Sequence, residues 1–170
     1  MIIHDVKPFK QQTRWSCGPA SLRTVLYYQF GLDFTDRELA VVLGATENGM
    51  SDFEHGLKIL GFDFKQSDHG NFNKLKKALA KHQLPIVHVV MKDGIGHYMT
   101  VTGYDDMDVI LSDPFTGTIV KYGIPFFLGV WKIEERESST RWFLVVTGRS
   151  KHKVQALIRQ LQNVQRKLST

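Results

Sequence analysis

The residue best suited to chemistry is Cys17, the only cysteine in the chain, which lies in the stretch "RWSCGPASLRTVLYYQF". A thiol reacts as its thiolate, and a free cysteine with a pKa of about 8.5 is mostly protonated at neutral pH. Cys17 precedes Gly-Pro-Ala where an apolar pattern of helical period begins. The unpaired N–H groups at a helix start stabilise an anion by about 0.3 to 2 kcal/mol. Gly18 would let a substrate backbone approach, and Pro19 suits the first helical turn. We therefore interpret Cys17 as a candidate nucleophile, the alternative being a buried structural thiol.

A cysteine nucleophile needs a base, and among the seven histidines His97 fits best. It follows the turn-like "KDGIG" and opens the alternating run "HYMTVTGY", which is typical of a strand. His88, inside "IVHVV", is interpreted as a hydrogen-bonded core residue. The other five fall in expected loops, on helix surfaces or near the end of the chain: His4, His55, His69, His82 and His152. His97 is therefore the candidate general base.

A carboxylate can be placed beside His97 by pairing two neighbouring runs. If residues 96–104 and 108–114 form a hairpin that turns near 105–108, the residue opposite His97 is close to Asp113 or a few positions beyond it. A carboxylate there could orient the imidazole and stabilise its cation. The alternative for Asp113 is a turn residue before Pro114.

Attack by a thiolate on a carbonyl also creates an oxyanion that needs hydrogen-bond donors. A side-chain amide and the backbone N–H of the nucleophile can supply them, and loss of one donor typically costs about 10² to 10³ in rate. Gln11 and Gln12 both lie a few residues before Cys17. Spacing alone does not choose between these two glutamines.

The elements that must position these residues change type along the chain. Apolar periodicity predicts a helix over residues 17–30, followed by Gly31. Two capping boxes, Thr35 with Glu38 and Ser51 with Glu54, each predict a short helix. The segment "NFNKLKKALAKHQ" predicts a fourth helix. This helix is opened by Asn71 or Asn73 and ends before Pro85.

Later segments are short, rich in β-branched residues and separated by Gly and Asp. They predict an antiparallel meander of the strands "PIVHVVM", "GHYMTVTGY", "DVILSDP" and "GTIVKY", with "RWFLVVTG" near residue 145 as one more strand. Helices first and strands second predict an α+β domain in which the first helix packs on the sheet.

Bulk composition narrows the classes of protein. The 170 residues are 42% hydrophobic and 23% charged, as expected for a globular domain. No apolar run is long enough to span a bilayer and no signal peptide is evident, so we expect a cytoplasmic protein without a membrane span. The net charge of +5 is concentrated in the last twenty residues, which argues against nucleic acid as a partner. Neither a metal-ligand spacing nor a glycine-rich phosphate loop occurs, so we expect no metal and no cofactor.

The chain divides into residues 1–149, the expected catalytic domain, and residues 150–170. In the second segment Val154, Leu157, Leu161, Val164 and Leu168 recur at steps of three and four, with Lys and Arg between them. This pattern predicts a basic amphipathic helix that lies on the domain surface or mediates contact with a partner or a second copy.

Taken together, these motifs resemble the papain-like cysteine peptidases that process double-glycine leader peptides of bacteriocins. The resemblance runs from about residue 11 to 131 and depends on Cys-Gly-x-Ala at a helix start, "GIGHYMTV" and "SDPFTG". It implies that Cys17 is the nucleophile, His97 the base, Asp113 the group that orients it and Gln11 the oxyanion donor. It also implies a papain-like fold, hydrolysis of peptide or protein substrates through an acyl-enzyme, and a leader peptide as one such substrate.

The chain departs from this family in two respects. Ser16 stands where the family commonly has Asp, and the exporter domains of many members, membrane spans and ATPase, are not found. The same Cys-His-Asp order also occurs in papain-like acyl and peptidyl transferases, which form the same thioester. A non-catalytic peptide-binding domain of this fold is the alternative from another class.

Overall fold

The computed structural model describes residues 1–48, 50–134 and 139–149. The helices are α1 (Cys17–Phe30), α2 (Asp36–Val42), α3 (Phe53–Leu60), α4 (Phe72–Leu79) and α5 (Ile124–Val130). The strands are β1 (Phe62–Ser67), β2 (Ile86–Val90), β3 (Gly96–Tyr104), β4 (Asp108–Asp113), β5 (Thr118–Gly123), β6 (Ile133–Glu134), β7 (Ser139–Thr140) and β8 (Phe143–Arg149).

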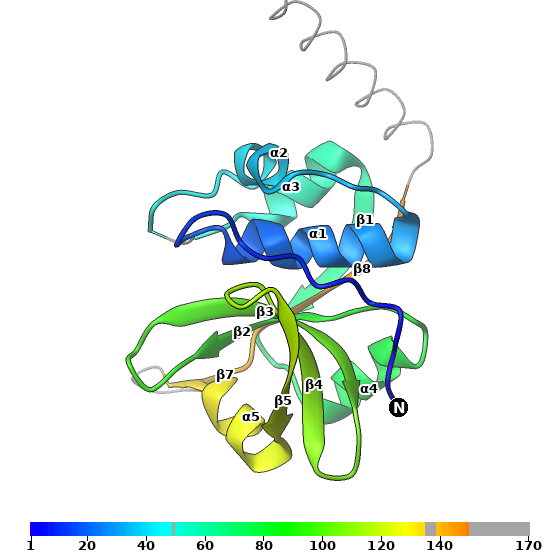
Figure 1. Ribbon diagram of the computed structural model, residues 1–170, viewed down its shortest axis with the longest axis vertical. Helices are drawn as coiled ribbons and strands as arrows, with labels where there is room; N and C mark the ends of the chain where they lie inside the picture. The colour runs from blue at the N-terminus through cyan, green and yellow to red at the C-terminus, as the bar shows by residue number, and fades with distance from the viewer. Residues whose placement is uncertain (49, 135–138, 150–170) are drawn as a thin grey trace, which may run out of the picture.

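Six of these strands form one antiparallel sheet in the order β1-β8-β2-β3-β4-β5. Helices α1, α2 and α3 form a layer on one side of this sheet (Figure 1). The predicted meander is confirmed, because β2 to β5 are neighbours in chain order, and the run near residue 145 is confirmed as β8. The α+β class is therefore confirmed as well.

Helix α1 packs on the sheet through its apolar face. Leu22, Val25 and Leu26 are fully buried in the core cluster that also contains the inward side chains of β3 and β4. Two polar contacts add to this packing: the Ser21 hydroxyl donates to the Tyr98 carbonyl at 3.2 Å, and the Thr100 hydroxyl donates to the Ser21 carbonyl at 3.2 Å. These bonds fix the start of α1 against the first half of β3, because a buried polar group is costly unless paired.

The predicted helix ends are confirmed at α1 and α2. Gly31 takes the left-handed conformation (φ 66°) that glycine adopts easily, and its N–H bonds the last carbonyls of α1. At α2, Thr35 accepts from the Glu38 N–H while the Glu38 carboxylate accepts from the Thr35 N–H, so both halves of this capping box are present.

The prediction for α3 is wrong by one residue. Asp52, not Ser51, caps this helix by accepting from the His55 N–H at 2.9 Å. For α4 the structure selects Asn71 over Asn73, with the Lys74 N–H as donor at 2.9 Å, and the helix ends at Leu79, earlier than predicted.

Strand β1 was not predicted, because the first half of the chain was expected to be helical. Its sequence "FDFKQS" has only two apolar residues, and only Phe62 is fully buried. Antiparallel pairing with β8, from Phe62 opposite Arg149 to Ser67 opposite Phe143, makes it a strand at the edge of the sheet. Because the pairing partner of β1 lies about eighty residues further along the chain, a local sequence pattern does not predict this strand.

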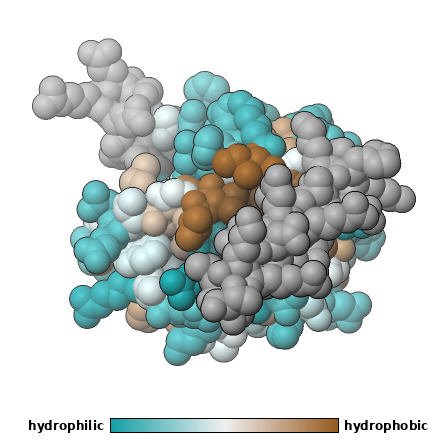
Figure 2. Space-filling model, turned by 90° about the horizontal axis from the view of Figure 1, so that it is seen from above, coloured by the Kyte–Doolittle hydropathy of each residue, from teal (hydrophilic) through white to brown (hydrophobic). Residues whose placement is uncertain are grey.

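Hydrophobic side chains cluster on the surface of the layer formed by α1, α2 and α3 (Figure 2). Among the exposed hydrophobic residues of these helices are Val41 and Ile59. No described helix is long and apolar enough to cross a membrane. The predicted amphipathic helix over residues 150–170 lies outside the described residues.

Candidate active site

Cys17 occupies the first position of α1, where it is 5% exposed. The pKa of its thiol lies below the ordinary value. Burial alone would raise this pKa, but a hydrogen bond and the charge of His97, together with backbone hydrogen bonds from Tyr98 and Gly18, outweigh it. Because these interactions favour the anion, Cys17 has the environment of a reactive cysteine and not that of an inert buried thiol.

His97 and Asp113 meet as the hairpin register requires. The β3–β4 pairing sets Thr100 opposite Ser112, which places Asp113 diagonally across from His97, and the His97 Nε2 lies 2.8 Å from the Asp113 Oδ1. Since Nε2 is bound to this carboxylate, Nδ1 is the ring nitrogen left to face the Cys17 sulfur. Burial would lower the pKa of His97, but hydrogen bonds to Asp113 and Cys17 and the charges of both raise it to about 9.

Asp113 is itself held in place by the turn that follows β4. Its Oδ1 accepts from the Phe115 N–H at 2.9 Å, and its Oδ2 accepts from the Thr116 hydroxyl at 3.3 Å. Burial opposes the ionised form, yet His97 and these donors keep the pKa of Asp113 below its ordinary value. Asp113 therefore does both: it takes part in the turn before Phe115, as the alternative from the sequence held, and it contacts His97.

These pKa shifts all favour the charged forms: they lower the pKa of the Cys17 thiol and of the Asp113 carboxyl and raise that of His97 to about 9. A thiolate is ready to attack an electrophilic carbon, and an adjacent imidazolium can protonate a leaving amine. This arrangement can carry out acyl transfer from an amide.

Gln11 lies beside the turn that contains Asp113. Its backbone N–H donates to the Pro114 carbonyl at 2.8 Å, and its side-chain Nε2 donates to the Thr13 carbonyl at 2.7 Å. A carboxamide nitrogen carries two hydrogens, and the bond to the Thr13 carbonyl uses one of them. Gln12 is exposed, and its backbone N–H bonds Ser16 and Asp36 instead.

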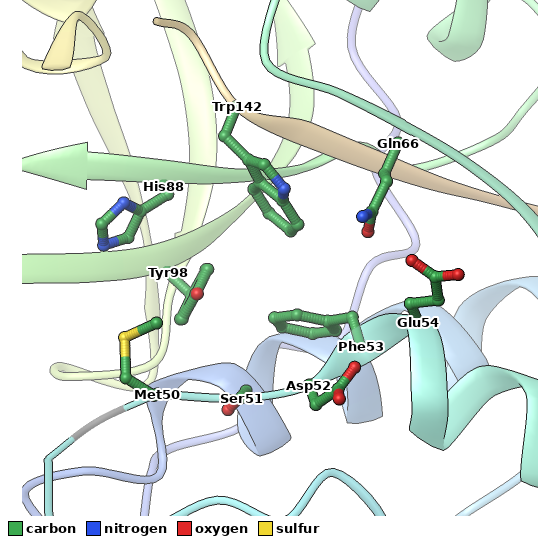
Figure 3. Close-up of a pocket in the computed structure, with 9 residues that line it drawn as sticks. All are labelled: Met50, Ser51, Asp52, Phe53, Glu54, Gln66, His88, Tyr98 and Trp142. Carbon is green, nitrogen blue, oxygen red and sulfur yellow. The ribbon is translucent and has the colours of Figure 1, made fainter. Parts of the chain in front are cut away.

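A pocket of about 420 Å³ opens between α3 and the sheet. Two of its lining residues lie next to the start of α1, because Ser51 approaches Gly18 and the Tyr98 backbone contacts Cys17. Its walls include the rings of Phe53, Tyr98 and Trp142, whose centroids lie 5.0 to 5.5 Å apart, with Met50 and His88 at one end (Figure 3). Burial, followed by the positive charge of His97, lowers the pKa of His88, which favours the neutral ring. The pocket is therefore largely apolar and aromatic.

The structure gives Gly18 a different role from the one expected. A Cβ at this position would collide with the Ser51 Oγ, so glycine is required for the approach of Ser51 to the start of α1. The sequence predicted that Gly18 makes room for substrate, but the space beside its Cα is occupied by a residue of the protein itself.

Sequence reasoning did not identify the pocket residues or Asp36. Phe53, Tyr98 and Trp142 are ordinary core types in the sequence, and only the fold brings them together. Asp36 follows the α2 cap, where an acidic residue is common, and no local signal marks its contact with the segment before Cys17. Among the described residues there is no group of His, Cys, Asp and Glu that could hold a metal ion.

A helix that starts at a cysteine and packs on an antiparallel sheet carrying the histidine and carboxylate is the architecture of the papain-like cysteine peptidases. More narrowly, the chain belongs to the Peptidase C39 family, which it matches over residues 5–134. The fold and enzyme class expected from the sequence are thereby confirmed.

The chain is also similar to individual proteins. An uncharacterized protein of Methanothermobacter marburgensis is 29% identical over 126 residues, which cover 70% of this chain and 84% of that protein. The peptidase domain of Streptococcus ComA, a bi-functional ABC transporter involved in a quorum-sensing pathway, has a TM-score of 0.68 at 20% identity, covering 85% of this chain and 99% of that domain. The peptidase domain of Streptococcus mutans ComA has a TM-score of 0.59 at 18% identity, covering 83% of this chain and 98% of that domain. The similarity to these two structures is one of fold.

Proposed function

We propose that Cys17, His97 and Asp113 form a catalytic triad that hydrolyses a peptide bond after Gly-Gly in a leader peptide. The observation that carries this proposal is the 2.8 Å contact between His97 and Asp113, with the same histidine lowering the pKa of Cys17. One ring thus links the carboxylate to the sulfur, as acyl transfer by a cysteine requires.

In the proposed reaction the Cys17 thiolate attacks the scissile carbonyl carbon, and the C=O electron pair moves onto oxygen. The free N–H of the Gln11 amide and the backbone N–H of Cys17 bind this oxyanion. His97 gives its Nδ1 proton to the leaving amine as the C–N bond breaks, which leaves a thioester. His97 then accepts a proton from water, the resulting hydroxide attacks the thioester, and the thiolate departs.

Two features favour Gly-Gly before the scissile bond. Ser51 packs against Gly18, the residue that follows Cys17, and a groove narrowed at this point would favour residues that lack side chains. The aromatic pocket begins beyond Ser51 and offers room for a larger apolar side chain on the same side of the substrate. The resemblance to double-glycine peptidases points to the same motif.

The test is cleavage of two internally quenched peptides that differ only in Gly-Gly against Ala-Ala at the expected site. We expect the wild type to cut the Gly-Gly peptide at least tenfold faster, with Cys17→Ala inactive on both. Equal rates would contradict the Gly-Gly assignment and leave the peptidase assignment standing.

A second arm of this experiment separates hydrolysis from transfer. Adding an amine such as glycinamide offers the thioester another nucleophile. We expect the free acid to remain the main product, identified by mass spectrometry. A conjugate as the main product would favour the transferase alternative.

A further inference from the structure

A buried carboxylate outside the triad contacts the segment that leads to Cys17. Asp36, the first residue of α2, is 2% exposed. Its Oδ2 accepts from the Gln12 N–H at 3.1 Å and from the Ser16 hydroxyl at 3.4 Å. The Arg23 guanidinium lies 3.9 Å from the Asp36 Oδ1 and pairs more closely with Asp33 at 2.7 Å. A carboxylate that is buried chiefly against backbone and hydroxyl donors holds those donors in a fixed geometry.

Ser16 extends this contact to the rest of the segment. Its Oγ accepts from the N–H groups of Gln12 and Thr13 at 3.1 and 3.0 Å. The carbonyl of Thr13 in turn accepts from the Gln11 Nε2 at 2.7 Å. A short series of hydrogen bonds therefore joins Asp36 to the side chain of Gln11, and Ser16 is linked to the N–H of Cys17 through their shared peptide bond.

We infer that Asp36 is a positioning residue that holds both oxyanion donors, the Gln11 amide and the Cys17 N–H, in the geometry the transition state needs. This inference rests on the proposed role of Gln11. Oxyanion donors are effective only when they are aligned before the charge develops, and a displacement of about 1 Å is enough to lose much of their effect. Asp36 touches neither substrate nor the reacting atoms, so its effect passes entirely through residues 11–17.

The experiment compares Asp36→Asn with the matched control Asp33→Asn. Both changes remove a carboxylate next to Arg23, but Asp33 is half-exposed and its side chain contacts Arg23. The probe is the quenched Gly-Gly peptide, with kcat and KM measured separately. A second readout is the alkylation rate of Cys17 by iodoacetamide, a substitution at carbon that forms no oxyanion.

We expect Asp36→Asn to lower kcat by about 10- to 100-fold, somewhat less than the loss of a whole donor, with KM and the alkylation rate within about twofold of wild type. Asp33→Asn should leave all three unchanged. A parallel fall in kcat and alkylation, or an unchanged kcat, would overturn the inference. If Asp36→Asn does not fold, Ser16→Ala breaks the same series of bonds and is judged by the same criteria.

A double variant separates this inference from the proposed function. In the Gln11→Ala background the donor is already lost, so adding Asp36→Asn should lower kcat only slightly further. Fully multiplicative effects would contradict positioning through Gln11. If Gln11→Ala lowers kcat and Asp36→Asn does not, only the inference fails. If Gln11→Ala itself has no effect, the proposed oxyanion role fails with it.

Discussion

At the scale of single residues, the reactivity of Cys17 depends on its neighbour His97. The pKa of the thiol is lowered, so the thiolate fraction at neutral pH exceeds that of a free cysteine. His97→Ala removes the cation while the burial of the thiol remains, so this pKa must rise. We expect iodoacetamide alkylation at pH 7 to slow by about tenfold or more and to approach the wild-type rate at pH 10. An unchanged rate at pH 7 would contradict the pairing.

Asp113 affects the same pair from the other side of the ring. Its carboxylate raises the pKa of His97, which is about 9 in the wild type, so His97 stays protonated up to that pH. Asp113→Asn keeps an acceptor oxygen but loses the charge, and the pKa of His97 must fall. The alkaline limb of the kcat profile should therefore move to lower pH, with kcat reduced by about 10²- to 10⁴-fold in Asp113→Ala and by less in Asp113→Asn. An alkaline limb that does not move would contradict this role.

At the scale of elements, the cap of α3 gives a direct test of the register found in the structure. Asp52 accepts from the first-turn N–H of His55, whereas the Ser51 Oγ is buried without a hydrogen-bond partner. Asp52→Ala should lower the free energy of unfolding by about 1 kcal/mol, measured by urea denaturation. Ser51→Ala, the matched control one residue away, should cost much less. The reverse order would support the capping box read from the sequence.

A helix or strand can be predicted from the sequence when the residues that fix it lie close to it in the chain. The ends of α1 and α2 are fixed by Gly31 and Thr35 within one turn of each helix, so both could be predicted. The β3–β4 hairpin is also local, and its register brings Asp113 to His97. Strand β1 depends on β8 and the Asp36 contacts depend on how α2 packs, so neither could be read from neighbouring residues.

At the scale of the whole molecule, the site lies where the helical layer meets the sheet, so its geometry depends on the shared core. Leu22 is fully buried between α1 and the sheet. Leu22→Ala should cost about 2 to 5 kcal/mol of unfolding free energy, and turnover should fall in proportion to the unfolded fraction. The check is thermal unfolding followed by circular dichroism. A variant with wild-type stability would contradict the assigned packing.

The division of the chain at residue 149 gives a second prediction at this scale. β8 pairs with β1 and β2 and ends at Arg149, so residues 1–149 contain every described strand of the sheet. We expect this truncated chain to keep the wild-type kcat on the Gly-Gly peptide. Light scattering on both chains then tests whether residues 150–170 mediate self-association. Loss of folding in the truncated chain would contradict the proposed boundary.

The central claim is that Cys17 forms a covalent acyl-enzyme, and rapid-quench mass spectrometry tests it most directly. A peptide ester ending in Gly-Gly acylates the enzyme quickly, so the thioester accumulates before water resolves it. We predict a mass increase equal to the acyl portion, located by digestion on the fragment that contains Cys17 and absent in Cys17→Ala. An adduct on any other residue, or turnover by Cys17→Ala, would contradict the account.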